Sequence, residues 1–405
     1  MARFTLKDYE GVSGTAIIDE CLALGERLKG YSILHINSTR IGGGVAEILN
    51  SLVPLMREVG LEAKWEVITG DPEFFYVTKQ IHNGMHGQPV NISGEMMESF
   101  MATARKNRGL LESGADMVIS HDQQPLGLTA LRKQTGSRWV WYCHIDPSNA
   151  DPAVWYFIAP MAAACDAAIL HLPEYARNIP VLQYFMPPAI DPLSEKNREV
   201  APEEYSTVLE KLGVEPEGPP VILQVSRFDR LKDPLGVIEA FKMVRENREC
   251  RLILAGGSAD DDPEGAAVLE EVRAAADGDP DILILALAPD ANLEINILQR
   301  RADVVVQKSV REGFGLTATE ALWKGRPIVA TPTGGLAHQV LDNRTGLVAK
   351  TTEEMASQVD KLLGDPELGR QLGAAGREYV RQSYILPVYL RNWLKFITLL
   401  SGQSR

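Results

Sequence analysis

Two carboxylates, Glu312 and Glu320, lie eight residues apart and flank a turn that contains Gly313 and Gly315. The residues after the turn predict a helix over 317–323. Backbone N–H groups at a helix start lack intrahelical partners, and the helix dipole is positive there, so such a turn attracts phosphate. Glycine lets a ligand approach the main chain closely. With a carboxylate on each side to accept hydrogen bonds from sugar hydroxyls, the segment predicts a binding site for a nucleotide sugar.

The same segment has a second interpretation, which is purely structural. Thr317 and Glu320 fit a capping box, in which Glu320 satisfies a backbone donor at the helix start. Glu312 could be a solvated loop charge. Under the binding hypothesis, the amides of Gly315, Leu316 and Thr317 bind the diphosphate instead.

Two cations follow the first predicted strand of the second half of the chain, Val221–Val225. Arg227 and Lys232 lie in the loop that connects this strand to the next helix. Cations in such a loop can neutralise the charge that develops on a leaving diphosphate without help from a metal ion. Solvated loop charges are the alternative, and the glutamate pair downstream favours the binding hypothesis.

A glycine run follows the first predicted strand of the chain, Ser32–Ile36. Gly43 and Gly44 open a helix and form a second candidate phosphate cradle, with Arg40 shortly before them. Glu47 stands where a dinucleotide fingerprint needs glycine, which disfavours a nicotinamide dehydrogenase. A tight strand–helix turn without a ligand is the alternative.

Two further segments place histidine next to aspartate after a strand. His144 and Asp146 follow the strand that ends at Cys143, and His121 and Asp122 follow the preceding strand. Side chains at strand ends can bind sugar hydroxyls, although a lone histidine is more often structural. Neither segment has metal-ligand spacing, so no protein ligands for a metal ion are expected.

Length and periodicity predict two α/β domains. With 405 residues the chain can fill two cores, and short apolar runs alternate with amphipathic segments, as in parallel sheets covered by helices. A proline-containing, charged stretch separates the halves, so we expect domains at 1–188 and 189–385 with a hinge near Met186–Asp191. The predicted strands are Ser32–Ile36, Lys64–Ile68, Met117–Ser120, Trp139–Cys143, Ala167–His171, Val221–Val225, Arg251–Ala255, Ile282–Leu287, Val304–Gln307 and Ile328–Ala330.

Charge and cysteine usage exclude several classes of protein. The chain carries 41 Lys and Arg against 54 Asp and Glu, and no basic stripe interrupts this acidic balance, so nucleic acid is not an expected partner. No apolar run reaches the roughly 20 residues of a membrane span, and no signal peptide is evident. The four cysteines are scattered, as in reduced cytoplasmic proteins.

Taken together, these motifs resemble the donor-site signature of retaining glycosyltransferases with two Rossmann domains, the GT-B fold. The combination of the 42–47 glycine segment, the two histidine–aspartate segments and residues 311–317 resembles, more narrowly, the trehalose glycosyltransferring synthases. Retaining trehalose phosphorylases are similar. The resemblance covers nearly the whole chain, and it implies two doubly wound domains that face a cleft, with helix 386–405 packing back on the first domain.

The resemblance also implies a reaction and roles for residues. Glucose would pass reversibly, with retention, from a nucleoside diphosphate glucose such as UDP-glucose or ADP-glucose to free glucose, giving trehalose. In a phosphorylase, phosphate would replace the nucleotide. Arg227 and Lys232 would bind the pyrophosphate, Glu312 the donor hexose and Glu320 the ribose, while His144 would orient the donor sugar.

The remaining candidates follow from the same resemblance. Gly43 and Gly44 would face the donor phosphate, and Asp233 follows Lys232 where similar proteins often carry glycine. We expect no tightly bound cofactor, Mg²⁺ only as a counter-ion of the diphosphate, and a homodimer. The acceptor side would be lined by Asp146, His121, Asp122 and Arg40.

Three other functions stay open from the sequence. A glycoside hydrolase could use Glu312 and Glu320 as acid and nucleophile, which requires the two carboxylates to lie about 5–10 Å apart. A sugar-nucleotide sensor would bind the same ligand without turnover. A related hexosyltransferase would use another acceptor.

Overall fold

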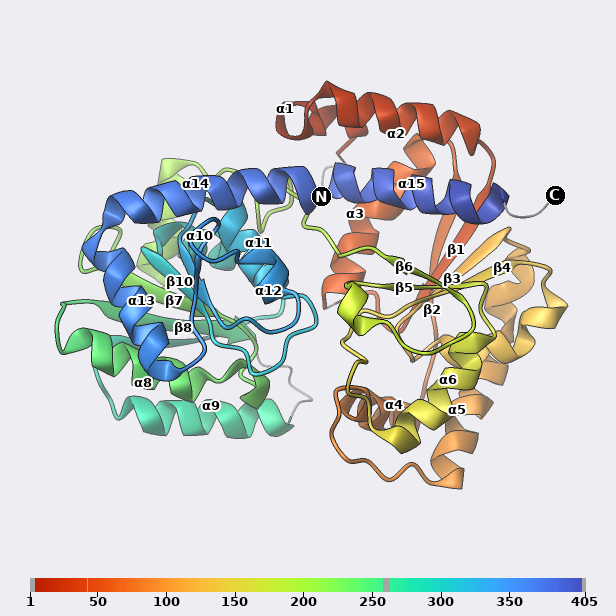
Figure 1. The fold of residues 1–405 in the computed structure, drawn as a ribbon, viewed down its shortest axis with the longest axis horizontal. Helices are drawn as coiled ribbons and strands as arrows, with labels where there is room; N and C mark the ends of the chain where they lie inside the picture. The colour runs from red at the N-terminus through yellow and green to blue at the C-terminus, as the bar shows by residue number, and fades with distance from the viewer. Residues whose placement is uncertain (1–3, 42, 258–262, 403–405) are drawn as a thin grey trace. The chain divides into compact units, whose positions relative to one another are not determined.

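The computed structural model describes residues 4–41, 43–257 and 263–402. The chain forms two compact units (Figure 1). The first comprises the residues up to Pro188 together with those from Leu386 onward, and the second runs from Ala189 to Ile385. Residues 1–3 and 403–405 of the domain ranges expected above lie outside the described part.

The first unit is built on a six-stranded sheet in which all neighbouring strands are parallel. The strand order is β2-β1-β3-β4-β5-β6. The strands are β1 (Ser32–Asn37), β2 (Glu62–Val67), β3 (Met117–His121), β4 (Arg138–Tyr142), β5 (Ala167–Leu170) and β6 (Leu182–Phe185).

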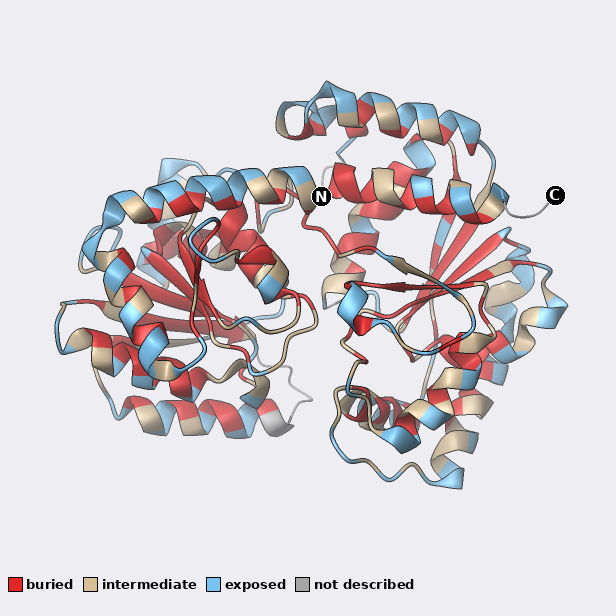
Figure 2. Ribbon diagram, viewed as in Figure 1, coloured by how far each residue is buried: buried red, intermediate tan, exposed pale blue. Residues whose placement is uncertain are grey.

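Helices cover both faces of this sheet, as its almost completely buried central strands require (Figures 1 and 2). One face carries α4 (Pro72–Met85), α5 (Gly94–Lys106) and α6 (Pro152–Ala163). The other carries α3 (Gly44–Glu58) and α15 (Leu386–Gly402), and α2 (Thr15–Arg27), which follows α1 (Glu10–Ser13), packs on the outer side of α15. Helix α15 packs against α2 and α3, far from them in sequence.

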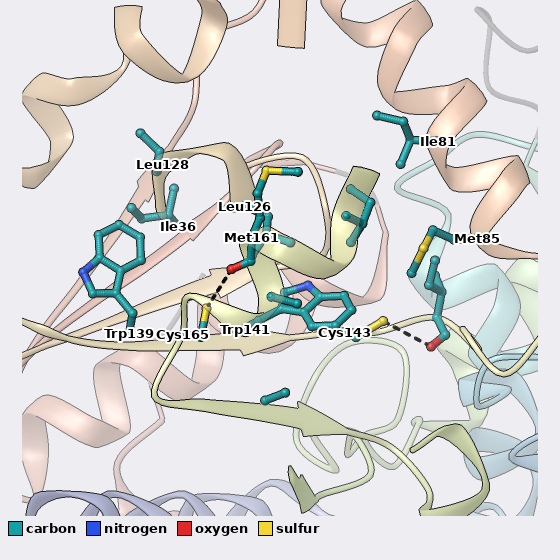
Figure 3. Packing of buried hydrophobic residues seen from close by; sticks show 14 of the residues in the cluster. Ile36, Ile81, Met85, Leu126, Leu128, Trp139, Trp141, Cys143, Met161 and Cys165 are labelled. Atoms are coloured by element: carbon teal, nitrogen blue, oxygen red, sulfur yellow. Dashed lines mark hydrogen bonds between the residues drawn. The ribbon is translucent and has the colours of Figure 1, made fainter. Parts of the chain in front are cut away.

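Alternate residues of β4 point to opposite faces of the sheet. Trp139 and Trp141 enter the core under α4, α5 and α6 together with Cys143 (Figure 3). Tyr142 points to the other face, where it hydrogen-bonds Tyr389 of α15. All four cysteines are buried free thiols, and burial raises the pKa of Cys165 to about 12.

The second unit repeats the same plan. Its six parallel strands are ordered β12-β11-β10-β7-β8-β9. They are β7 (Val221–Val225), β8 (Arg251–Gly257), β9 (Ile282–Leu287), β10 (Val304–Gln307), β11 (Ile328–Ala330) and β12 (Leu347–Val348). The helices are α7 (Pro202–Lys211), α8 (Pro234–Arg245), α9 (Pro263–Ala276), α10 (Asn292–Arg301), α11 (Leu316–Trp323), α12 (Leu336–Gln339), α13 (Thr352–Gly364) and α14 (Pro366–Ser383).

The strand order of each sheet reverses at one position, and the loops on either side of that position become neighbours. In the first unit β1 pairs with both β2 and β3. In the second unit β7 pairs with both β8 and β10, with Leu223 beside Val305. Ligands of doubly wound sheets bind outside the carboxyl ends of the strands at such a switch point. The segments that follow β7 and β10 are those predicted to bind the diphosphate.

Candidate functional site

The turn after β10 is built around Gly315. Its φ is +88°, and it forms the N-cap of α11, which begins at Leu316. A Cβ at this position would lie 2.9 Å from the Cδ2 atom of Leu336 and 3.2 Å from the Cγ atom of Glu312. Both the backbone angle and the close side chains therefore require glycine. The helix begins one residue before the predicted Thr317.

Glu320 does not form a capping box with Thr317, because Gly315 caps the helix without a side-chain hydrogen bond. The Glu320 side chain is 4% exposed, and its Oε1 lies 3.8 Å from Nζ of Lys196. The structural interpretation of Glu320 as a cap is therefore wrong, and the carboxylate is a buried group beside a cation.

Buried polar side chains fix α11 and the turn before it. The Nζ of Lys324 donates to Oε1 of Gln299 at 2.8 Å and to Oδ1 of Asn197 at 3.0 Å. The amide of Gln339 donates to the carbonyl of Phe314 and accepts a bond of 2.6 Å from the hydroxyl of Thr319. Since unmade bonds of buried polar groups are costly, this network holds the turn in one conformation.

Lys232 and Glu312, predicted separately, are direct partners. The Nζ of Lys232 lies 2.6 Å from Oε2 of Glu312, and the hydroxyl of Ser309 donates to the same oxygen at 3.2 Å. Only 17% of the Lys232 side chain and 10% of the Glu312 side chain are exposed. The topology therefore brings a cation from the loop after β7 onto a carboxylate from the loop after β10.

Arg227 lies in the same loop but is more exposed. Its guanidinium pairs with Asp229 at 3.2 Å, and 58% of its side chain is accessible. The carboxylate of Asp229 also accepts a bond from the backbone N–H of Leu231. Arg227 is thus an exposed cation in the same loop as Lys232, and its side chain can change rotamer.

Asp233 explains why a glycine would also suit the position after Lys232. Its φ is +46°, a left-handed conformation that glycine adopts freely and aspartate tolerates. The carboxylate of Asp233 caps α8 through the N–H of Gly236 and forms an ion pair with Lys308. Lys308 was not among the sequence candidates, although its place directly after β10 could have suggested it.

In the first unit, His121 and His144 lie together in a larger group of histidines. Nδ1 of His121 is 2.9 Å from Nε2 of His144, and Nδ1 of His35 is 2.9 Å from Nε2 of His121. Nε2 of His171 lies 3.3 Å from Nδ1 of His144. His144 is partly exposed, and the other three are buried. Sequence reasoning missed His35 and His171.

Asp122 supports the loop that carries His144. Its carboxylate accepts a bond of 2.7 Å from the backbone N–H of His144, and its own φ is +63°. Desolvation by the surrounding protein raises the pKa of Asp122 to about 7, and the His144 bond opposes part of that increase. Asp122 therefore holds the His144 loop, whether or not it also contacts a ligand.

Three other candidates have structural roles within the protein. Asp146 accepts a bond of 2.9 Å from the N–H of Ser148. Arg40 stacks over Trp65 at 4.7 Å and donates to the carbonyl of that residue. Gly43 has φ +79° and caps α3, which begins at Gly44. Gly42, the first glycine of the run, lies outside the described residues.

The described residues contain neither a cluster of metal ligands nor a membrane-spanning helix. No three His, Cys, Asp or Glu side chains of residues 4–41, 43–257 and 263–402 gather as metal ligands would. Within the same residues, every helix is too short or too polar to cross a membrane.

Comparison with known proteins identifies the family. Residues 35–177 match the family described as "Trehalose synthase, N-terminal domain", and residues 209–379 match "Glycosyl transferases group 1". The chain is 40% identical to a trehalose synthase of Pyrococcus horikoshii, over 98% of this chain and 97% of that protein. The chain belongs to the trehalose synthase family. Another member, from Rubrobacter xylanophilus, is 41% identical over 98% of this chain and 97% of its own length.

More distant similarities fit this family. A trehalose phosphorylase of Pleurotus pulmonarius is 24% identical over 93% of this chain and 58% of that protein. The solved structure of sucrose-phosphate synthase from Thermosynechococcus elongatus superposes with a TM-score of 0.72 at 19% identity, covering 92% of this chain and 100% of that one. This member of the trehalose synthase family is therefore a glycosyltransferase with the GT-B fold.

Proposed function

We propose that the chain transfers glucose from a nucleoside diphosphate glucose to free glucose with retention, forms trehalose, and catalyses the reverse reaction. The names of its relatives support the product. The observation that carries the proposal is the Lys232–Glu312 pair, which lies beside Gly315 at the switch point of the second sheet. The cation and the helix start suit the phosphate of a sugar nucleotide, and the carboxylate suits the hydroxyls of its sugar.

The ion pair suggests how the donor is bound. Without a ligand, Lys232 and Glu312 neutralise each other in a mostly buried position. A diphosphate competes for Lys232 and leaves Glu312 to accept hydrogen bonds from hexose hydroxyls. The amides at Gly315, Leu316 and Thr317, together with Arg227, stabilise the charge that develops on the leaving phosphate.

The proposed chemistry needs no nucleophile from the protein. The bond between the anomeric carbon and the phosphate oxygen breaks, and the acceptor hydroxyl oxygen bonds to the same face of that carbon. The acceptor proton passes to the departing phosphate oxygen, so atoms and charge balance. Glu320, whose carboxylate is buried beside Lys196, is assigned to the donor ribose, with a purely structural role as the alternative.

The remaining assignments belong to the first unit. His144, as the partly exposed histidine, orients the donor sugar, and the glycines at the start of α3 face the donor phosphate. His121, Asp122, Asp146 and Arg40 are on the acceptor side, where the first two also act through the His144 loop. Mg²⁺ acts only as a counter-ion of the diphosphate. We place the enzyme in the cytoplasm as a homodimer.

Phosphorolysis of trehalose is the second candidate. It is motivated by the similarity to a trehalose phosphorylase, in which inorganic phosphate would occupy the place of the leaving diphosphate. The same cations and amides would bind either the leaving diphosphate or the attacking inorganic phosphate, so the geometry of the second unit favours neither.

Product analysis by NMR tests both. The protein is mixed with glucose and UDP-, ADP- or GDP-glucose, and separately with trehalose and phosphate. An α,α-linked disaccharide with release of nucleotide supports the proposal and ranks the bases. Turnover only with trehalose and phosphate moves the assignment to a phosphorylase, and no product in any mixture refutes both. We expect Lys232→Met to be inactive and Lys211→Met to keep full activity as its matched control, since 72% of the Lys211 side chain is accessible.

A further inference from the structure

The four histidines of the first unit form a continuous row of hydrogen bonds. The row runs from His35 on β1 through His121 at the end of β3 to His144 and then His171. These residues are far apart in sequence: His121 lies 23 positions before His144, and His35 lies 109 positions before it. We call these four residues the histidine row.

Each contact in the row joins an Nδ1 atom of one ring to an Nε2 atom of the next. A neutral imidazole has one N–H and one lone pair, so it can donate at only one nitrogen. All three bonds therefore form only if every ring carries its proton on the same kind of nitrogen. One ring in the opposite tautomer would bring two lone pairs or two N–H groups face to face.

The surroundings keep the row neutral and well ordered. Desolvation lowers the pKa of His35 to about 3, and it also lowers the pKa of His121 and His144. The rings of His121 and His144 are nearly coplanar, with 17° between their planes, and the centroid of the Tyr142 ring lies 3.9 Å from that of His144. Trp393 of α15 packs edge-on against His35.

His144 is the most accessible member of the row. His35, His121 and His171 are 0%, 2% and 3% exposed, whereas His144 is intermediate. His144 has a buried histidine on each side, His121 and His171, and buried partners of this kind fix the orientation of an accessible residue. No other role in the proposed reaction uses His35.

We infer that His35 and His121 are positioning residues, which fix the tautomer and the ring orientation of His144 through the histidine row. The functional part of this inference rests on the proposed role of His144 toward the donor sugar. The tautomer of the distant His35 is then tied to that of His144, although the two rings do not touch.

The direct test measures tautomers in the unmodified protein. The chain contains seven histidines, and ¹⁵N-labelled imidazoles can be assigned by single substitution and classified by their nitrogen shifts. We expect His35, His121 and His144 to carry the proton on the same kind of nitrogen from pH 6 to pH 8. Opposite tautomers in any two of these three rings would overturn the inference, and this measurement requires no substrate.

The second test perturbs the far end of the row. His35→Leu removes the partner of His121, whereas His35→Asn keeps an amide near the position of Nδ1. In His35→Leu we expect the His144 nitrogen shifts to move and kcat/KM for the donor to fall about threefold to tenfold, the range expected for loss of one hydrogen bond. His35→Asn should restore most of both. Nucleoside diphosphate affinity should not change, since His144 is assigned to the donor sugar and not to the nucleotide.

Ile33→Val is the matched control, because Ile33 is a buried residue two positions before His35 on β1. It should leave the His144 shifts and the kinetics unchanged. Unchanged His144 shifts in folded His35→Leu would refute the inference. If the tautomers match but the protein makes no disaccharide, the tautomers support the histidine row and the missing product refutes the proposed transfer.

Discussion

Replacement of Gly315 by alanine tests whether the turn before α11 positions Glu312. Gly315 has φ +88°, and the left-handed backbone costs an ordinary residue about 1–2 kcal/mol. The added Cβ would also lie 2.9 Å from Leu336 and 3.2 Å from the Cγ of Glu312, so one of these side chains must move. We expect the free energy of unfolding to fall by about 1–2 kcal/mol from strain alone, with a decrease of roughly 2–8 °C in Tm.

The effect on activity should be larger than the effect on stability. Misplacement of a catalytic group by about 1 Å can reduce the rate by roughly 100-fold. We therefore expect kcat of Gly315→Ala to fall by about 10- to 100-fold at a temperature where the variant is fully folded. Initial rates of nucleotide release, measured with circular dichroism on the same samples, separate the two effects.

Gly213→Ala is the control for backbone strain. Gly213 has φ +67° in the same unit, and nothing lies within 4 Å of an added Cβ. It should lose a similar free energy of unfolding and keep its activity. Full activity in Gly315→Ala, or an equal loss of activity in Gly213→Ala, would refute the argument that the turn works by positioning Glu312.

Three further substitutions address single groups. Glu312→Ala removes the partner of Lys232 and should lower kcat, measured by initial rates, far more than it weakens nucleotide binding, measured by titration. A kcat equal to that of the unmodified protein would show that Glu312 has no role in the reaction. Glu320→Gln should raise the donor KM if the buried carboxylate binds ribose, and an unchanged KM with a lower Tm would make it a structural partner of Lys196. The raised pKa of Asp122, about 7, means that the folded state binds its proton more tightly than the unfolded chain. Its contribution to stability is thus present below about pH 4 and is lost as the pH rises through 7, so Asp122→Asn should flatten the pH dependence of urea unfolding in this range.

The sequence was sufficient to predict the ten strands listed above, and the structure confirms each with ends within two residues. Continuous apolar runs such as Val221–Val225 are unambiguous because buried parallel strands need no polar face. β6, with its partly exposed residues, was missed for the opposite reason.

The candidate site was predictable only in part, because spacing along the chain carries no strand order. Lys232 and Glu312 are 80 positions apart, and only the pairing of β7 with β10 makes them partners. Likewise, His35 looks like a lone polar residue in an apolar strand until β1 is placed beside β3. The buried carboxylate of Glu320 lies beside Lys196, and no local sequence motif predicts this pairing.

The discontinuous first unit has a consequence for biosynthesis. Residues 4–188 leave the ribosome first, yet the helix that covers one face of their sheet, α15, is translated after the whole second unit. Trp393, Phe396 and Ile397 of that helix are completely buried in the first unit. The first unit therefore keeps an open apolar face until its last helix arrives, and it cannot complete its folding while the second unit is being synthesised.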